Sequence, residues 1–212
     1  MKKTLIIERR AHVYIQKPNK EIKSLLIVIH GYGQRAEDFI KEFDYLKKTN
    51  TLVVAPEGIS KYYNSKREAV ASWMTAHERL DEIADYCSYL NKVLLYLNQE
   101  YSFSKFGVLG FSQGVSTVCR WIAASHFKKA KLYLCAGSIP PELEAKDFEN
   151  QKELKVNYYY GDEDRLLSIA NAKRQIAVLY RLKIDFDSYL YNGRHKVAEL
   201  CHNHIATQMN NY

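Results

Sequence analysis

The sequence has little proline and glycine, with 4 and 9 respectively among 212 residues. This scarcity argues against long linkers and disordered stretches. Hydrophobic residues make up 47% of the chain and aromatic residues 13%, which is enough material for a buried core. A chain of this length buries roughly 70% of its extended surface on folding. We therefore expect residues 1–212 to form a single domain.

Long hydrophobic runs are also missing. The first ten residues, MKKTLIIERR, contain only Leu5, Ile6 and Ile7 in succession, whereas a secretory signal needs at least about seven apolar residues. No run approaches the ~20 residues of a membrane span. The four cysteines form no C-x-x-C pair and lie among apolar residues, so we expect buried free thiols. These absences predict a cytoplasmic protein without stable membrane insertion.

The charge of the chain does not indicate a nucleic-acid partner. The formal net charge is +7, but 24 acidic residues are dispersed among the basic ones and no basic run exceeds two residues. The chain also lacks zinc-finger and RNA-binding signatures. We therefore expect no nucleic-acid binding.

A metal site is not expected either. Cys201, His202 and His204 lie close together in sequence, but H-x-H on a helix places the two imidazoles on different faces. No further cysteine or acidic residue lies at a recognised zinc-ligand spacing. We expect His202 to be exposed and His204 to lie on the packed face of its helix.

Hydrophobic periodicity predicts alternating strands and helices. Unbroken apolar runs are typical of parallel strands covered on both faces, and strands alternating with helices indicate an α/β fold with a mostly parallel sheet. We expect two short strands within 4–16 and further strands at 24–30, 51–55, 106–111, 131–136, 154–160 and 185–191. Helices are expected at about 36–48, 78–97, 114–127, 168–182 and 196–209. The apolar stripe of the second helix comprises Leu80, Ile83, Cys87, Leu90, Leu94 and Leu97, and this spacing is typical of an amphipathic helix.

Chemically useful side chains follow several of the predicted strands. Ser112 follows the strand at 106–111, Gly161-Asp162-Glu163-Asp164 follows 154–160, and His195 follows 185–191. Ligand sites of parallel sheets form beyond the carboxyl ends of the strands. The chain order Ser, Asp, His is the order found in α/β-hydrolases.

Ser112 lies in a G-x-S-x-G pattern formed with Gly110 and Gly114, between an apolar strand and a helix. Such a pattern is typical of a nucleophile on a sharp turn, although a simple strand–helix turn would also contain glycines. A serine hydroxyl needs an imidazole to take its proton, and a carboxylate to orient that imidazole. The backbone N–H groups of Gln113 and of Tyr32, in the loop HGYG, are the predicted oxyanion donors.

Four segments resemble the phospholipase/carboxylesterase branch of the α/β-hydrolases, which includes acyl-protein thioesterases. They are HGYGQRAEDF (30–39), VLGFSQGV (108–115), GDEDRLL (161–167) and YNGRHKV (191–197). The resemblance implies an α/β-hydrolase fold and hydrolysis of an ester or thioester through an acyl-serine, with no cofactor and no metal. Single helices or modest loops fill the gaps between the predicted strands, so we expect no large cap domain and a shallow, open cleft that favours short or medium acyl groups. It implies Ser112 as nucleophile, His195 as base and Asp164 as the acid, with Asp162 as the alternative acid.

Two further features surround these residues. His30 precedes the serine and is expected to brace the HGYG loop by hydrogen bonding. The segment 57–75 fits neither a helical nor a strand period and contains Tyr62, Tyr63, Trp73 and Met74. These four residues either line the substrate pocket or pack beneath the loop as a small separate core.

The sequence therefore predicts a serine hydrolase that cleaves carboxylic esters of short or medium acyl groups. Thioesters and lysophospholipids are alternative small-molecule substrates for the same triad, and a serine peptidase is more remote. The alternative from another class is a non-catalytic binding protein with the same fold.

Overall fold

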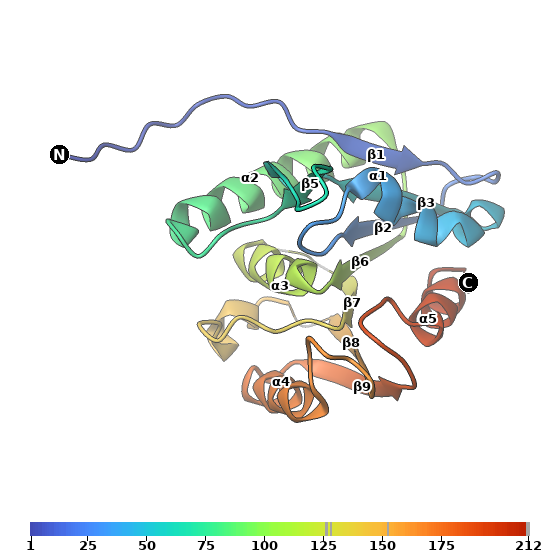
Figure 1. Ribbon diagram of the computed structural model, residues 1–212. Helices are drawn as coiled ribbons and strands as arrows, with labels where there is room; N and C mark the ends of the chain where they lie inside the picture. The colour runs from blue at the N-terminus through green and yellow to red at the C-terminus, as the bar shows by residue number, and fades with distance from the viewer. Residues whose placement is uncertain (126, 128, 152, 211–212) are drawn as a thin grey trace.

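The structure, a computed structural model, describes residues 1–125, 127, 129–151 and 153–210. Its centre is a seven-stranded sheet of order β1-β3-β2-β6-β7-β8-β9 (Figure 1). β1 is antiparallel to β3, and the other neighbours are parallel. The strands are β1 (Val13–Gln16), β2 (Ser24–Ile29), β3 (Thr51–Pro56), β6 (Lys105–Phe111), β7 (Ala130–Cys135), β8 (Leu154–Gly161) and β9 (Asp185–Tyr191). The predicted parallel sheet is confirmed.

Helices cover both faces of the sheet. They are α1 (Ala36–Phe39), α2 (Arg79–Glu100), α3 (Gln113–Ala124), α4 (Ile169–Arg181) and α5 (Glu199–Asn210). The described residues also form two 3-10 helices, Ile40–Lys48 and Ala145–Phe148. One core cluster contains buried residues of α2, α3 and α4, and the other contains those of α1, the first 3-10 helix and α5. Figure 1 shows these two groups on opposite sides of the strands.

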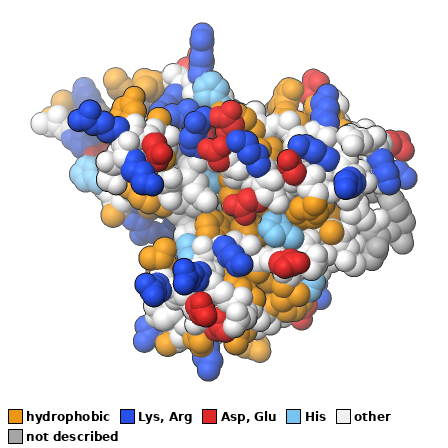
Figure 2. Space-filling view, turned by 45° about the vertical axis from the view of Figure 1, so that its right-hand side comes forward, with side chains coloured by type: hydrophobic (Ala, Val, Ile, Leu, Met, Phe, Trp, Pro, Cys, Tyr) orange, Lys and Arg blue, Asp and Glu red, His pale blue; other side chains and the backbone are white. Residues whose placement is uncertain are grey.

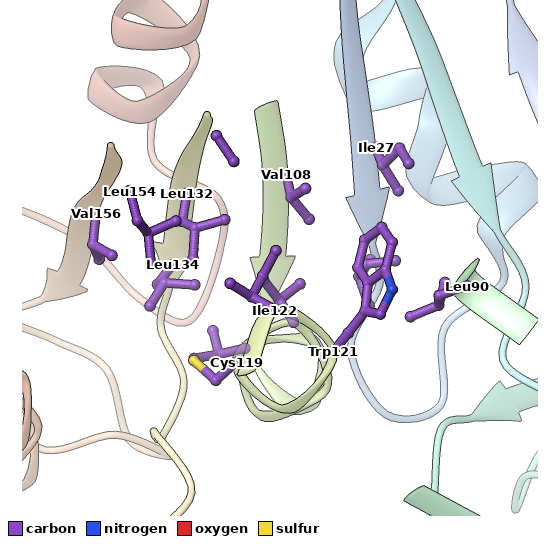
Figure 3. Close-up of a cluster of buried hydrophobic side chains, with 14 of the residues drawn as sticks. Ile27, Leu90, Val108, Cys119, Trp121, Ile122, Leu132, Leu134, Leu154 and Val156 are labelled. Carbon is purple, nitrogen blue, oxygen red and sulfur yellow. The ribbon is translucent and has the colours of Figure 1, made fainter. Parts of the chain in front are cut away.

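Interleaved aliphatic side chains form the first of these cores. Figure 3 shows Trp121 and Ile122 of α3 packed towards residues of the central strands, with Leu90 of α2 beside them. All three of these side chains are fully buried. Burial of such a side chain contributes about 1.5–3 kcal/mol. The four cysteines are free and buried, as predicted.

Several boundaries differ from the sequence predictions. Of the two strands expected within 4–16, only β1 forms, because only 13–16 meets a neighbouring strand. Leu80, expected in the buried stripe of α2, is exposed in the first helical turn. α5 begins at Glu199 rather than at 196, because the Tyr191 hydroxyl holds the preceding loop at the carbonyls of Arg194 and Lys196. Position 126 of the predicted helix 114–127 lies outside the described residues.

The segment 57–75 is not the irregular loop that we expected. It contains a hairpin of β4 (Ser60–Tyr63) and β5 (Ala69–Ser72), paired antiparallel. The Asn64 side chain closes its turn by accepting hydrogen bonds from the amides of Lys66 and Glu68. The side chains of β4 are exposed or half-buried, whereas most of those of β5 are buried. The two strands therefore share no pattern of alternating apolar and polar residues. β5 also bridges to the HGYG loop through Gln34 and Ala71.

Candidate active site

The turn between β6 and α3 holds Ser112 in an unusual backbone conformation. Its φ and ψ are 53° and −116°, a region that costs a non-glycine residue on the order of 1–3 kcal/mol and is concentrated at functional sites. The Ser112 amide donates to the carbonyl of Cys135 at 2.9 Å. The turn therefore fixes the backbone of Ser112 against the end of β7.

The two glycines of G-x-S-x-G are required by close backbone contacts. A Cβ atom on Gly110 would lie 2.6 Å from the carbonyl oxygen of Gly114. A Cβ atom on Gly114 would lie 2.2 Å from the carbonyl oxygen of Ile29. Real Cβ atoms do not approach backbone this closely, so larger residues would push the start of α3 away from β2. The structure thus gives these glycines a steric role beyond ordinary chain flexibility.

Asp164 and His195 lie at the carboxyl ends of β8 and β9 and are hydrogen bonded to each other. The His195 Nδ1 atom is 2.8 Å from Asp164 Oδ2. The other carboxylate oxygen of Asp164 accepts from the amides of Leu166 and Leu167 at 2.8 and 2.9 Å. An ionised carboxylate only accepts, so His195 carries a proton on Nδ1 and leaves Nε2 as an acceptor. This is the tautomer that a general base needs.

His195 also lies beside the turn that carries Ser112. Its ring centroid is 4.9 Å from that of Phe111, the residue before Ser112. In the part of the chain that the structure describes, the Ser112 hydroxyl makes no hydrogen bond to His195. A nucleophile–base contact is often long before substrate binds and tightens in the complex.

Asp162, the alternative acid, has a different contact. Its Oδ1 accepts from the Gly193 amide at 2.8 Å, and its Oδ2 accepts from the Asn192 side chain at 3.3 Å. Asp162 therefore holds the loop that carries His195, whereas Asp164 contacts the imidazole itself. Arg194 points to Glu163, with 3.8 Å between Nε and Oε2, and is 82% exposed at its side chain.

The two proposed oxyanion donors both have free amides. Among the described residues, the N–H groups of Tyr32 and Gln113 have no hydrogen-bond acceptor. Gln113 is the first residue of α3, and the first N–H groups of a helix are left without an intrahelical partner and favour negative charge. The neighbouring amides of Gly31 and Gly33 are instead bonded to Gln34 Oε1 and to the Ala71 carbonyl.

His30 braces the HGYG loop, as the sequence predicted. Its Nε2 accepts from the Gly58 amide at 3.0 Å, so its Nδ1 carries the proton and donates to the Gly31 carbonyl at 2.8 Å. Burial lowers the pKa of His30, which keeps the imidazole neutral. Sequence reasoning missed Glu57, whose buried carboxylate accepts from the Ala36 amide at 2.8 Å. Its position directly after β3 was the available signal.

The four residues proposed to line the pocket are not placed alike. Tyr63 is 77% exposed, whereas Trp73 is fully buried and donates from Nε1 to the His30 carbonyl at 3.0 Å. Trp73 therefore packs beneath the loop, the alternative that the sequence left open. Tyr62 stacks on Tyr32 at 5.2 Å between centroids. Partial burial and the Tyr32 hydroxyl raise the pKa of Tyr62 to about 12, so its phenol is neutral.

Met74 follows the β4–β5 hairpin and contacts α3. Its sulfur accepts a contact from the Arg120 guanidinium at 3.2 Å, and its side chain is partly buried against the core.

A cavity of about 580 Å³ opens between α1 and the β4–β5 hairpin, and its lining includes Arg35, Asp38, Glu42 and Glu68. Neither Ser112 nor His195 contributes to that cavity, so it does not define a pocket at the candidate triad.

The structure shows no metal-ligand group within its described residues. His202 is partly buried rather than exposed, because its Nδ1 lies 3.3 Å from the Tyr45 hydroxyl under the first 3-10 helix. His204 Nδ1 contacts the Tyr159 hydroxyl at 2.9 Å. The two rings thus point to different neighbours.

The surface charges are mixed. Figure 2 shows basic and acidic side chains intermingled on the face in view.

Comparison with known proteins identifies the family. The sequence matches the phospholipase/carboxylesterase family over residues 10–210. The chain belongs to this family. Its members are hydrolases of the carboxylesterase and acyl-protein thioesterase type, and its fold is the α/β-hydrolase fold.

Solved structures agree with this fold. Esterase PE8 has a TM-score of 0.72 at 18% identity, with 94% of this chain and 98% of that chain covered. Acyl-protein thioesterase 2 of Zea mays has a TM-score of 0.70 at 14% identity, covering 94% and 97%. The Bacillus cereus carboxylesterase has a TM-score of 0.69 at 16% identity, covering 94% and 93%.

A comparison with curated protein sequences found no match. None of the helices in the described part of this hydrolase-family chain combines the length and apolar composition needed to cross a lipid bilayer.

Proposed function

We propose that this family member is a serine esterase that cleaves carboxylic esters of short or medium acyl groups through an acyl-serine. Ser112 is the nucleophile, His195 the base and Asp164 the acid of its triad. The observation that carries the proposal is the hydrogen bond between His195 and Asp164, formed at the strand ends next to the strained turn of Ser112. A protein that only bound ligand would need neither the strained serine nor the oriented imidazole.

The proposed reaction has two halves. His195 Nε2 takes the proton of Ser112 as the hydroxyl oxygen attacks the ester carbonyl carbon, and the resulting oxyanion accepts from the amides of Tyr32 and Gln113. Collapse of this intermediate breaks the bond to the leaving alcohol, which takes the proton from His195. Water then attacks the acyl-serine by the same route and releases the carboxylic acid. Asp164 stabilises the imidazolium in both halves.

The substrate is a small-molecule ester in the first instance, and Tyr62, Tyr63 and Met74 are proposed to contact it. Tyr62 stacks on Tyr32 of the HGYG loop, and the next residue, Tyr63, is 77% exposed. These placements support an open rather than an enclosed acyl site. A thioester is the second candidate, because a structural relative is named an acyl-protein thioesterase. A lysophospholipid would use the same triad.

A fluorophosphonate probe tests the proposal directly. The wild-type protein should be labelled at Ser112, as mapped by mass spectrometry, and Ser112→Ala and His195→Ala should lose labelling while remaining folded. His77→Ala is the matched control, because His77 is 89% exposed at its side chain and has no role in the triad. Absence of labelling in the wild-type protein would support a non-catalytic binding protein.

The chain length of the substrate is tested with p-nitrophenyl esters. An open acyl site predicts faster hydrolysis of the acetate and butyrate esters than of the palmitate ester. Palmitoyl-CoA and a lysophosphatidylcholine, assayed under the same conditions, distinguish the thioesterase and lysophospholipase alternatives. Equal rates for butyrate and palmitate esters would contradict the short-chain preference.

A further inference from the structure

The side chain of Gln113 makes contacts that the proposed reaction does not use. Its Oε1 accepts from the Trp73 amide at 3.1 Å and from the Ser72 hydroxyl at 3.2 Å. Its Nε2 donates to the Met74 carbonyl at 2.8 Å and lies 3.1 Å from the Ser72 hydroxyl. A carboxamide has two donors and one acceptor oxygen with two lone pairs. The Gln113 carboxamide therefore ties α3 to Ser72, the last residue of β5, and to the two residues that follow it.

The same stretch of chain also holds the HGYG loop. The Gly33 amide donates to the Ala71 carbonyl at 2.9 Å, and the Ala71 amide donates to the Gln34 carbonyl at 3.1 Å. Trp73 Nε1 donates to the His30 carbonyl at 3.0 Å. Residues 71–74 thus contact the loop of one oxyanion donor and the side chain of the residue that supplies the other.

These contacts form a closed path between the two donors. From Tyr32 the path runs through Gly33 to Ala71, then along the chain to Trp73, and across hydrogen bonds to Gln113. Trp73 and Ser72 are buried, and buried hydrogen bonds are held in place because breaking them leaves unsatisfied polar groups. The relative position of the Tyr32 and Gln113 amides is therefore set through residues 71–74.

We propose that the Gln113 carboxamide is a positioning residue that fixes the spacing of the two oxyanion donors by clamping residues 72–74. This inference rests on the proposed function and assigns the side chain of Gln113 a role separate from that of its backbone amide. Preorganised donors act only when they are aimed at the oxyanion, and a misplacement of about 1 Å can cost about 100-fold in rate. Loss of the clamp should therefore slow the chemical step more than it weakens substrate binding.

Gln113→Met is the substitution that tests the clamp. Methionine is similar in length, adds no charge beside the oxyanion and keeps the backbone amide, but it forms none of the four side-chain contacts. We expect kcat for p-nitrophenyl butyrate to fall about 10–100-fold with KM changed less than about threefold. Inhibition by an alkyl trifluoromethyl ketone, whose adduct carries an oxyanion, should weaken by a similar factor. The pH at which kcat/KM falls on the acidic side should stay unchanged, since the contact of His195 with Asp164 is untouched.

Two variants on the same elements separate positioning from general damage. Ser72→Ala removes one partner of the clamp and should lower kcat by about two- to fivefold. Ser116→Ala removes a hydrogen bond from the same helix α3, to the Ser138 carbonyl at 2.6 Å, without touching the clamp, and should keep the wild-type kcat. Thermal unfolding of each variant ensures that rates are compared well below the melting temperature.

The results distinguish this inference from the proposed function. Wild-type kcat in Gln113→Met, a rise in KM alone, or an equal loss in Ser116→Ala would overturn the clamp while leaving the serine esterase intact. If the wild-type protein hydrolysed no ester, or if its hydrolysis did not require Ser112, then both the clamp and the proposed serine esterase would be overturned. A selective fall of kcat in Gln113→Met, graded through Ser72→Ala, supports the clamp.

Discussion

Different interactions hold the nucleophile turn, residues 110–114 with the proposed nucleophile Ser112, and the base loop, residues 192–195 with the proposed base His195. In the turn, backbone packs directly on backbone: a side chain on Gly114 would overlap the carbonyl of Ile29. In the base loop, two carboxylates hold the chain, with Asp162 on the Gly193 amide and Asp164 on the imidazole of His195. Damage to the turn should therefore appear as lost stability. Damage to the base loop should appear as lost rate in a folded protein.

The largest effect is expected from Asp164→Asn in the base loop. The asparagine oxygen can still accept from the amides of Leu166 and Leu167, but its NH2 group would face His195 Nδ1, so the ring would favour the tautomer with its proton on Nε2. Such a ring cannot take the serine proton. We expect kcat to fall about 10³–10⁴-fold, with the melting temperature changed by only a few degrees, measured by ester hydrolysis and circular dichroism.

Asp162→Asn is the matched control for this substitution. Its side-chain oxygen can still accept from the Gly193 amide, so kcat should fall less than about tenfold. If Asp162→Asn lost as much activity as Asp164→Asn, then the assignment of the acid would be wrong.

The next largest effect is expected from Gly114→Ala in the nucleophile turn. The new methyl group would lie 2.2 Å from the Ile29 carbonyl oxygen and 2.8 Å from that of His30, so α3 or β2 must shift. We expect the free energy of unfolding to fall by about 3 kcal/mol or more, measured by urea denaturation.

Gly107→Ala on β6 provides the comparison for Gly114→Ala. Its Cβ atom would lie 3.1 Å from the flexible sulfur of Met209, which can move aside, so the loss should stay below about 1.5 kcal/mol. Equal destabilisation by the two substitutions would show that the close backbone contact at Gly114 is not the reason why the turn excludes a side chain.

The smallest effect is expected in the pH dependence of stability, through His30, the residue that braces the HGYG loop. Burial lowers the pKa of His30, and also that of His202. Near and below pH 6.5 the unfolded chain therefore binds more protons than the folded one. The free energy of unfolding should decrease as the pH falls from about 6.5 towards the lower folded-state values, by up to about 1.4 kcal/mol per pH unit for each histidine. Above about pH 8 these two groups should contribute almost no slope.

Urea denaturation between pH 5 and 8 measures this slope. His30→Gln should reduce the slope and leave the part due to His202, whereas His77→Gln, at an exposed position, should leave it as it is in the wild-type protein. An unchanged slope in His30→Gln would mean that the brace of the HGYG loop does not depend on a neutral imidazole.

The sequence anticipated most of the sheet and the location of the candidate site. Six of the expected strands are present with bounds shifted by one residue or less. Five of them are apolar runs, because strands covered on both faces require such runs, whereas β9 alternates and is largely not buried. The residues at their carboxyl ends followed from the same argument. The expectation of a single domain over 1–212, and the catalytic roles of Ser112, Asp164 and His195, remain predictions.

Residues 1–12 and 57–75 were harder to predict. The first has the β-branched composition of a strand but no neighbouring strand to pair with. The second is a hairpin whose two strands bury different amounts of side chain, so no single period describes it. The clamp of Gln113 on Ser72, Trp73 and Met74 has no local pattern in the sequence, since about 40 residues separate its partners.

The amino-acid sequence alone determined the order of the six parallel strands, the sharp turn at Ser112 and the residue types available at the strand ends. These properties are local, because apolar periodicity and glycine spacing act over a few neighbouring residues. Only the tertiary structure decided which carboxylate contacts His195, that Trp73 lies beneath the loop, and that residues 71–74 contact both the HGYG loop and the Gln113 side chain. Those outcomes depend on contacts between distant segments, which exist only once the sheet has brought their ends together.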